Sequence, residues 1–216
     1  MEKYISKKEK ASYGFAAVGS YMVAGITQSY LMYFFTDILI IPSAFVMMLM
    51  IVAMVWDALN DPMMGVIVDR TSTKYGKMRP YVLVGSFLML FTTIVLFMPL
   101  TGAPTMFKMI FAAVSYIIFG MAYTLTDVPA MGLMSVATPN SDERASLLSF
   151  YVTVGSVGSL LPVGLLTIFQ SFIPEKYVYF AMSIFVGIIT SAAYLTLFKN
   201  SKERFSTHTE KLPFET

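Results

Sequence analysis

Residues 43–68 read SAFVMMLMIVAMVWDALNDPMMGVIV, an apolar run interrupted by two aspartates and one asparagine. About 20 apolar residues in a helix cross the hydrocarbon core of a bilayer, so this run is long enough to span a membrane. An acidic side chain inside such a span costs roughly 2.5–3.5 kcal/mol on insertion scales, and it usually faces a cavity and serves a function. We therefore expect a membrane helix here that carries a polar site.

The rest of the chain repeats this apolar pattern. Of its 216 residues 56% are hydrophobic and 13% are charged, whereas about 25% are charged in soluble domains. The sequence predicts an all-α membrane protein with six transmembrane helices in residues 1–198, followed by a cytoplasmic segment at 199–216. The predicted spans lie near residues 11–36, 43–68, 81–99, 107–135, 146–170 and 177–198.

Composition also excludes several functions. The chain has no cysteine, which rules out disulfides and thiolate chemistry, and its net charge of +2 gives no reason to expect a nucleic-acid partner. The only histidine, His208, lies in the polar segment at the end of the chain, and we assign it no catalytic or metal-binding role.

Positive charges lie almost entirely on one side of the predicted membrane. With six spans both termini share a side, and that side receives 13 of the 15 Lys and Arg residues. The opposite side receives only Lys108 and Lys176, and we expect no Lys or Arg inside a span. The positive-inside rule therefore predicts that both termini are cytoplasmic in a multi-pass protein of the plasma (inner) membrane.

The two aspartates of the opening stretch, Asp57 and Asp61, are four residues apart, so both lie on one helical face about 6 Å apart along the axis. Two carboxylates this close in a low dielectric need either a shared proton or a cation between them. Asn60 adds a carbonyl oxygen, and Pro62 frees the backbone carbonyl of Ala58. This pattern predicts a site for a coupling cation, Na⁺ or H⁺, with Asp57 and Asp61 as ligands of Na⁺, and no other cofactor. Pairing with Lys or Arg of a neighbouring helix is the structural alternative, and no such partner is expected inside the spans.

A third acidic residue, Asp127, lies in the run YTLTDVP at 123–129. Thr124 lies three residues earlier and therefore on the same helical face. Their oxygens could complete a cation shell or bind sugar hydroxyls. Pro129 frees the carbonyl of Leu125, as in the interrupted helices that transporters use near binding sites.

Six stretches carry a resemblance to a known family. They read YGF at 13–15, YLMYFFTD at 30–37, WDALNDP at 56–62, GVIVDRT at 65–71, YGKMRP at 75–80 and TDVP at 126–129. The chain resembles, along essentially its whole length, the glycoside–pentoside–hexuronide:cation symporters of the major facilitator superfamily. The resemblance implies one half of that fold, made of two inverted three-helix repeats, and symport of a sugar with a cation by alternating access.

The resemblance also implies roles for particular residues. It assigns the cation site to Asp57, Asp61, Asn60 and Thr124, and a sugar-binding role to Asp127, with Tyr123 nearby. The chain departs from the melibiose-transporting members of the family where they have a second sugar-binding aspartate, a stacking aromatic residue and an arginine. The residues at those positions are Tyr21, Met131 and Val152, respectively. Tyr21 and Gln28 are further candidates for the sugar pocket, because polar side chains inside a span tend to face the bundle interior.

The loop after the second span resembles a motif of the superfamily to which a gating role is given. Gly65 is expected to allow close helix packing, and the charged residues of the loop to form cytoplasmic ion pairs that break as the two halves move. The candidate gating residues are Gly65, Asp69, Arg70, Gly76, Lys77, Arg79 and Arg144. The alternative is that these positive charges only set the topology.

The resemblance further implies that the second six-helix half is missing from this chain. A fragment, a split transporter with a partner chain and a homodimer all remain open. Other functions that we consider are a non-transporting receptor or assembly subunit and a carrier of lipid-type substrates. An intramembrane aspartyl hydrolase also needs paired acids, but its Gly-x-Gly-Asp signature is absent, and we expect no enzyme.

Overall fold

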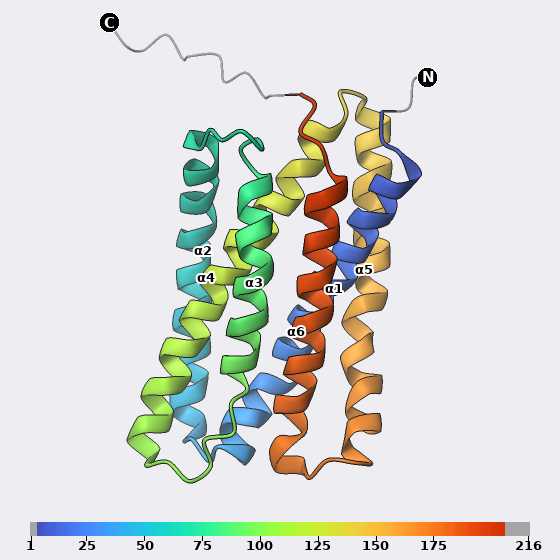
Figure 1. Cartoon of the computed structure of the whole chain (residues 1–216). Coiled ribbons are helices and arrows are strands. Elements are labelled where there is room, and N and C mark those ends of the chain that lie inside the picture. Colours follow the sequence, from blue (N-terminus) through green and yellow to red (C-terminus); the bar gives the residue numbers. More distant parts are fainter. Residues whose placement is uncertain (1–3, 206–216) are drawn as a thin grey trace, which may run out of the picture.

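The computed structural model describes residues 4–205, and each of the six predicted apolar stretches is a helix (Figure 1). The predicted all-α fold is therefore confirmed, with helix ends that differ from the predicted ones by several residues. The helices are α1 (Lys7–Tyr33), continued by a π-helical turn η1 (Phe34–Ile38), α2 (Ser43–Arg70), α3 (Arg79–Leu96), α4 (Thr105–Ala137), α5 (Ser141–Gln170) and α6 (Glu175–Asn200).

Local sequence explains where these helices begin. Three helices, α2, α4 and α6, begin directly after a proline: Pro42, Pro104 and Pro174, respectively. A helix does not readily extend back through a proline, because proline has no backbone N–H to donate. The side chain of Ser6 accepts a hydrogen bond from the N–H of Glu9 at the start of α1, and Asn140 caps α5 in the same way.

Five helices, α2 to α6, are long and apolar enough to cross a membrane within the described part of the chain. The first helix does not meet that criterion, because it carries several Ser, Gly and Tyr residues together with Thr27 and Gln28. Its position explains this composition, since α1 packs along α5 and α6 and buries about half of its residues against protein.

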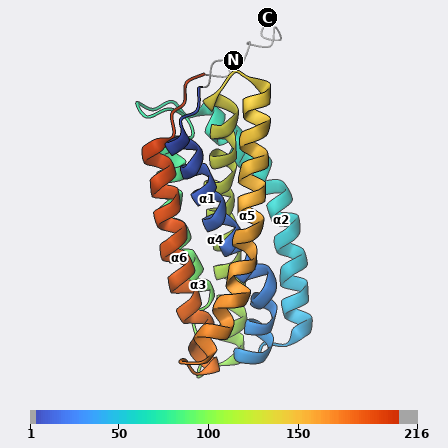
Figure 2. The ribbon, with the colours of Figure 1, turned by 90° about the vertical axis from the view of Figure 1, so that its right-hand side faces the viewer.

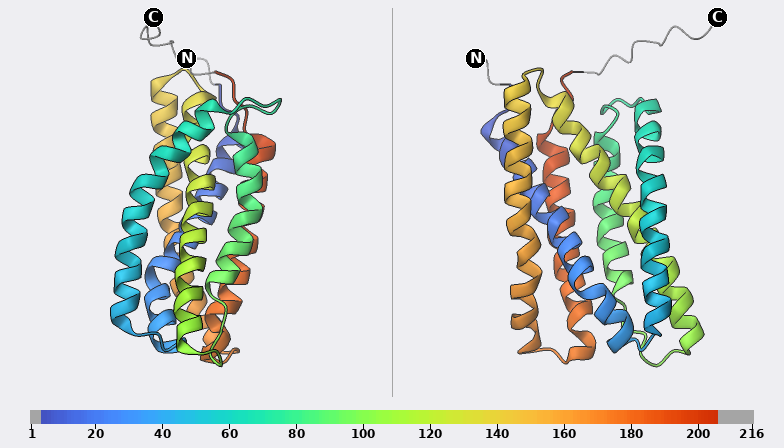
Figure 3. Two further views of the ribbon diagram at one scale, coloured as in Figure 1. Left: turned by 90° about the vertical axis from the view of Figure 1, so that its left-hand side faces the viewer. Right: turned by 180° about the vertical axis from the view of Figure 1, so that it is seen from behind.

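The bundle is arranged around α1, α3, α4 and α6, with α2 and α5 at opposite sides (Figures 1 and 3). Contacts join α3 to both α4 and α6, whereas α2 packs mainly on α4. Viewed from the side, all helices run along one long axis (Figure 2). Buried apolar residues such as Phe34, Phe97 and Met182 form the larger of two core clusters, and most of α2 and α5 is left exposed.

Small residues allow α1 and α5 to pack closely. A Cβ at Gly158 would lie 2.9 Å from the Cα of Val18, and one at Gly25 would lie 2.6 Å from the carbonyl oxygen of Ser159. Side chains at these positions would push the two backbones apart. Gly158 therefore allows the close approach of α1 and α5, whereas a Cβ at Gly164 of α5 would have nothing within 4 Å.

Lys108, which we expected on the side of the membrane opposite the termini, lies at the start of α4 and is buried. This residue lies in the first turn of α4, is only 6% exposed, and donates from Nζ to the carbonyl oxygen of Leu39 at 2.6 Å. Carbonyls at a helix C-terminus lack partners and attract cations, which is why the lysine is tolerated there. Lys108 is 12 residues from Gly120, a separation of about 18 Å along the axis of α4.

The two described ends of the chain meet at one end of the bundle. The rings of Tyr4 and Phe205 contact each other edge to face, with centroids 5.7 Å apart. The guanidinium of Arg204 pairs with the buried carboxylate of Glu9 at 2.7 Å, and its backbone N–H donates to the carbonyl oxygen of Val136. The segment after α6 thus fastens α1 and α4 together. Lys211 and His208 lie outside the described residues.

Candidate cation and substrate site

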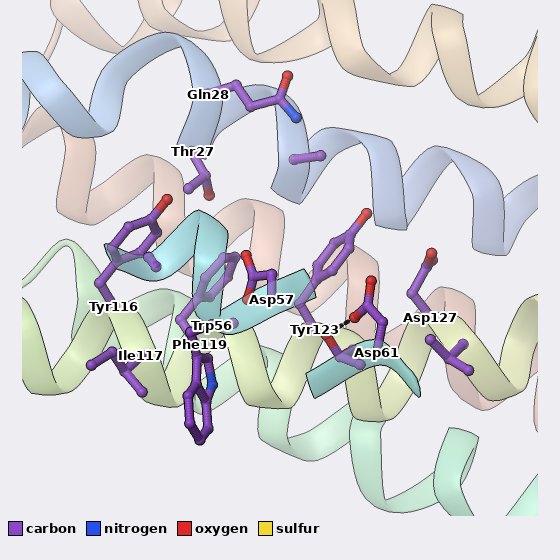
Figure 4. Close-up of a pocket in the computed structure, with 15 residues that line it drawn as sticks. Thr27, Gln28, Trp56, Asp57, Asp61, Tyr116, Ile117, Phe119, Tyr123 and Asp127 are labelled. Carbon is purple, nitrogen blue, oxygen red and sulfur yellow. Dashed lines mark hydrogen bonds between the residues drawn. The ribbon is translucent and has the colours of Figure 1, made fainter. Parts of the chain in front are cut away.

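A cavity of about 260 Å³ opens between α1, α2 and α4 (Figure 4). Its wall combines three carboxylates with hydroxyl groups and aromatic rings. The lining residues are Ala24, Thr27 and Gln28 of α1; Ala53, Trp56, Asp57 and Asp61 of α2; and Tyr116, Ile117, Phe119, Gly120, Tyr123, Thr124, Asp127 and Val128 of α4. The three acidic residues predicted inside spans therefore share one cavity.

Asp57 and Asp61 project from α2 on the side of Tyr123, whereas Trp56 extends in the opposite direction (Figure 4). The hydroxyl of Thr124 donates to Oδ1 of Asp61 at 2.8 Å. Asp57 lies over Gly120, where a Cβ would be 3.0 Å from its Oδ1. A glycine at this point of α4 thus gives the carboxylate of Asp57 room beside the helix.

Asn60 lies close to these groups in sequence, but it does not line the cavity. Its Nδ2 is buried and has no hydrogen-bond partner among the described residues. Rotating the amide by half a turn would exchange this donor for a carbonyl oxygen, which is the atom that a hard cation needs. No group of three or more acidic, histidine or cysteine side chains suited to a metal occurs in residues 4–205. A cation here would depend on two carboxylates and neutral oxygens, a donor set that fits Na⁺.

Asp127 is held by hydroxyl groups from three other helices. Its Oδ1 accepts hydrogen bonds from Ser20 of α1 at 2.7 Å, Tyr194 of α6 at 3.3 Å and Tyr151 of α5 at 3.5 Å. The hydroxyl of Tyr123 lies 3.1 Å from that of Ser20. We call Ser20, Tyr151 and Tyr194 the hydroxyl cage.

The structure brings together most, but not all, of the residues predicted for the sugar pocket. Asp127, Tyr123 and Gln28 line the cavity together with Asp57, Asp61 and Thr124. Tyr21 does not line it, because its ring packs against Gly155 of α5, where a Cβ would lie 2.7 Å from the ring. Met131 is exposed and lies outside the cavity wall as well.

Sequence reasoning missed the hydroxyl cage and the two other hydroxyl-bearing side chains of the cavity wall, Thr27 and Tyr116. Part of the signal was present, because Tyr116, Gly120, Tyr123 and Asp127 follow one another at intervals of three or four residues. That spacing places them on one helical face. The hydroxyl cage gave no such signal, since its members lie on three different helices.

The predicted gating residues lie at the end of the bundle where the chain ends meet. No ion pair within residues 4–205 involves Asp69, Arg70, Lys77, Arg79 or Arg144. Instead the guanidinium of Arg79 donates to the carbonyl oxygen of Phe198 at 2.7 Å. Gly65 has nothing within 4 Å of a Cβ built on it, so the close packing expected there has no partner in this bundle.

Backbone N–H groups at the start of α3 bind the segment after α6. Glu203 accepts hydrogen bonds from the N–H groups of Lys77, Met78 and Arg79 at 2.8, 2.9 and 3.0 Å. Gly76, with φ of 105°, lies directly against this carboxylate. These loop residues therefore form hydrogen bonds through their backbone N–H groups. The charge pattern of the loop did not indicate such a contact.

Comparison with known proteins agrees with these observations. Residues 12–214 match the family described as MFS/sugar transport protein. The chain is 33% identical over 208 residues to an uncharacterized symporter, YjmB, of Bacillus subtilis, covering 94% of the chain and 45% of that protein. It is 30% identical over 206 residues to a putative glycoside/cation symporter, YagG, of Escherichia coli, covering 94% of the chain and 44% of the relative.

An isoprimeverose transporter of Lactiplantibacillus pentosus is 28% identical over 216 residues, which cover 96% of the chain and 45% of that transporter. The chain therefore spans less than half the length of these relatives. Its five apolar helices and these relatives make it a multi-pass membrane protein. The resemblance predicted from the motifs is confirmed, and the chain belongs to the MFS/sugar transport protein family.

Proposed function

We propose that this chain is the amino-terminal half of a sugar:cation symporter that works by alternating access. The observation that carries the proposal is the cavity in which Asp57, Asp61 and Asp127 meet. Acidic residues at membrane depth mark ion and substrate pathways, and this cavity lies between helices, where transporter sites are found. The names of two relatives, the putative glycoside/cation symporter YagG and the isoprimeverose transporter, support this substrate class.

In this proposal the cation binds between Asp57 and Asp61, with the hydroxyl oxygen of Thr124 and the amide oxygen of Asn60 as neutral ligands. The substrate binds at Asp127. Thr124 and Asp127 lie one turn apart on α4, so a cation that moves Thr124 also acts on the helix that carries the substrate carboxylate. Such coupling is reciprocal: the cation tightens substrate binding by the factor by which substrate tightens cation binding.

The proposed architecture has six membrane spans with both termini cytoplasmic in the plasma (inner) membrane, and two inverted three-helix repeats. The pattern of helix neighbours supports the repeats. Exchanging α1, α2 and α3 with α4, α5 and α6 turns the α1–α5 contact into α4–α2 and the α1–α6 contact into α4–α3. The α3–α6 contact maps onto itself. The α5–α6 contact is the one extensive contact without a counterpart, which would lie between α2 and α3.

Binding of Na⁺ tests the cation site on the 216-residue chain itself. Radioactive Na⁺ is added to the chain in nanodiscs, and fluorescence of Trp56, the only tryptophan, reports on the cavity. We expect saturable Na⁺ binding that is lost in Asp57→Asn and Asp61→Asn. Asp142→Asn is the control, because Asp142 is exposed at the start of α5. Saturable binding that persists in both cavity variants would remove the basis of the proposal; if the wild type binds no Na⁺, the same variants are assayed for proton release.

Transport tests the proposal that a second half is needed. Proteoliposomes that contain only the 216-residue chain should show little or no sugar-driven Na⁺ uptake, because six helices do not enclose a substrate from both sides. Robust coupled uptake by the chain alone would contradict the proposal that a separate second half is needed, and it would favour a functional homodimer.

A further inference from the structure

The turn between η1 and α2 contains a strained residue. Ile40 has φ of 57°, and it is the only residue other than glycine with a positive φ within residues 4–205. A branched Cβ is crowded by the backbone in this left-handed region, so glycine is the usual residue there. The side chain of Ile40 is 72% exposed, so its own burial does not offset the strain. Other interactions must hold this conformation.

Buried neighbours fix the chain on either side of Ile40. Leu39 is fully buried and Ile41 is 2% exposed, both in the larger core cluster. The N–H of Ile41 donates to the carbonyl oxygen of Phe35 at 2.9 Å, and Pro42 favours an extended backbone at the residue before it. These contacts leave one peptide free, the one between Leu39 and Ile40, which can rotate about the line joining its two Cα atoms while its neighbours stay in place.

Lys108 fixes that remaining peptide. Its buried Nζ donates to the carbonyl oxygen of Leu39 at 2.6 Å, and this carbonyl belongs to the peptide that precedes Ile40. The N–H of the same peptide has no hydrogen-bond partner among the described residues. A rotation by half a turn would make the φ of Ile40 negative and relieve the strain, and Leu39, with φ of −84°, tolerates the extended ψ that results. The carbonyl oxygen would then point away from Lys108, so the hydrogen bond and the relaxed backbone exclude each other.

The turn lies where two walls of the cavity meet. Because η1 continues α1 and the turn leads into α2, both helices that face α4 across the cavity are joined here, at the end of the bundle opposite the two chain ends (Figure 1). Within residues 4–205, the bond from Lys108 is the only hydrogen bond between this turn and α4. Strained backbone is concentrated at sites and switch regions, where the surrounding structure holds it in place.

We propose that the Leu39–Ile40 peptide is a two-position switch and that Lys108 is its latch. In the latched position the ammonium binds the carbonyl oxygen of Leu39, and Ile40 is left-handed. In the released position the peptide is inverted, Ile40 is relaxed, and the turn is free of α4. The left-handed form of a residue with a Cβ is disfavoured about tenfold, or about 1.4 kcal/mol, and one hydrogen bond from a charged donor offsets such a difference. The two positions are therefore close in free energy, as a switch requires.

A single NMR signal reports the position of the peptide. Leu39–Ile40 is the only Leu–Ile pair in the 216-residue chain, so ¹³C in leucine carbonyls and ¹⁵N in isoleucine give one correlated signal in nanodiscs. Lys108→Met removes the donor, and we expect the signal to move as the released form becomes the major one, by about tenfold. Lys176→Met is the matched control, because Lys176 is exposed at the start of α6, and it should leave the signal in place. An unchanged signal in Lys108→Met overturns the proposal.

Ile40→Gly separates a switch from the mere loss of a hydrogen bond. Glycine adopts a positive φ without strain, so the peptide has no reason to invert when Lys108→Met is added. The chain has no Leu–Gly pair of its own, and ¹⁵N-glycine labelling of the Ile40→Gly variant therefore also gives one signal. We expect Lys108→Met to move this signal far less than it moves the signal of the chain with Ile40. Equal shifts in both backgrounds overturn the switch, because they report only the lost hydrogen bond.

The distance between the turn and α4 tests the latch by a second measurement. The chain has no cysteine, so spin labels can be attached at Ser43→Cys and Met106→Cys, two exposed positions at this end of the bundle. We expect one narrow distance while Lys108 is present and a second, longer distance after Lys108→Met. A single unchanged distance overturns the role of Lys108 in holding the turn to α4. Neither measurement uses Na⁺ or sugar, so failure of the switch is distinguishable from failure of the proposed transport function.

Discussion

The hydroxyl of Thr124 on α4 donates a hydrogen bond to Asp61 on α2 at 2.8 Å. In a cation-bound site the same oxygen would turn a lone pair toward the ion, because a hydroxyl can donate and accept. Thr124 therefore joins α2 to α4 without a cation and can serve as a ligand with one. This exchange links ion binding to the relative position of the two helices.

Thr124→Val tests this exchange, since it keeps the shape of the side chain and removes the hydroxyl. We expect Na⁺ affinity to fall by about tenfold, the equivalent of one hydrogen bond or ligand of about 1.4 kcal/mol. Thr124→Ser should bind Na⁺ nearly as well as the wild type. Thr126→Val is the control on the same helix, because the hydroxyl of Thr126 donates to the carbonyl oxygen of Ala122 and does not line the cavity. Equal Na⁺ affinities in Thr124→Val and the wild type would exclude Thr124 as a ligand.

The pair of Glu9 and Arg204 should stabilise the end of the bundle where the two described ends of the chain meet. Glu9 is 1% exposed, and Arg204→Ala would leave its carboxylate buried without the guanidinium. We expect a loss of about 2–3 kcal/mol in unfolding free energy, because removing one partner of a buried ion pair leaves the other charge unpaired. The partial exposure of Arg204 keeps the loss from being larger. Unfolding in mixed detergent micelles measures the loss. Adding Glu9→Gln to Arg204→Ala should recover part of the stability, and a double variant with the sum of both losses would argue against the pair.

Glu143 should make the docking of the amino-terminal segment sensitive to acid. Partial burial raises the pKa of Glu143, but hydrogen bonds from the hydroxyl of Thr138 and the N–H groups of Ile5 and Tyr4 outweigh it and hold the pKa below its ordinary value. A carboxyl with a lowered folded-state pKa stabilises the fold above its unfolded pKa, about 4.3. That contribution is lost as the pH falls through the folded-state pKa.

The measurement is the difference in melting temperature between the wild type and Glu143→Gln in detergent. We expect a constant difference at neutral pH that begins to shrink as the pH falls below the unfolded-state pKa, about 4.3, and is lost once the wild-type carboxyl is protonated in the folded state as well. A difference that does not change with pH would show that the charge of Glu143 contributes nothing to docking.

The helices and the three acidic residues that line the cavity could be predicted because each leaves a local signal. Long apolar runs define the helices, and Asp57 and Asp61 stand out because charge at membrane depth is costly. The partners of Asp127 could not be predicted, because tertiary packing brings Ser20, Tyr151 and Tyr194 together from three helices. The burial of Lys108 could not be predicted for a related reason, because the carbonyl oxygen that accepts its hydrogen bond belongs to another helix.

The contact between Gly76 and Glu203 provides a final prediction. Gly76 has φ of 105°, a region that residues with a Cβ rarely adopt, and a Cβ there would overlap the Glu203 carboxylate. Gly76→Ala should therefore dislodge Glu203 from the N–H groups at the start of α3, and we expect a loss of about 2 kcal/mol in unfolding free energy. Glu203→Ala should cost about 1–2 kcal/mol by removing the same hydrogen bonds.

Because both changes break one contact, the double variant should lose clearly less than the sum of the two single losses. Gly102→Ala is the matched control: this glycine lies in the loop before α4, has no neighbour within 4 Å of a Cβ and lacks a positive φ. Its stability should stay within about 0.5 kcal/mol of the wild type. Additive losses in the double variant would mean that Gly76 acts through backbone strain alone, and that the carboxylate of Glu203 does not depend on the space that glycine leaves.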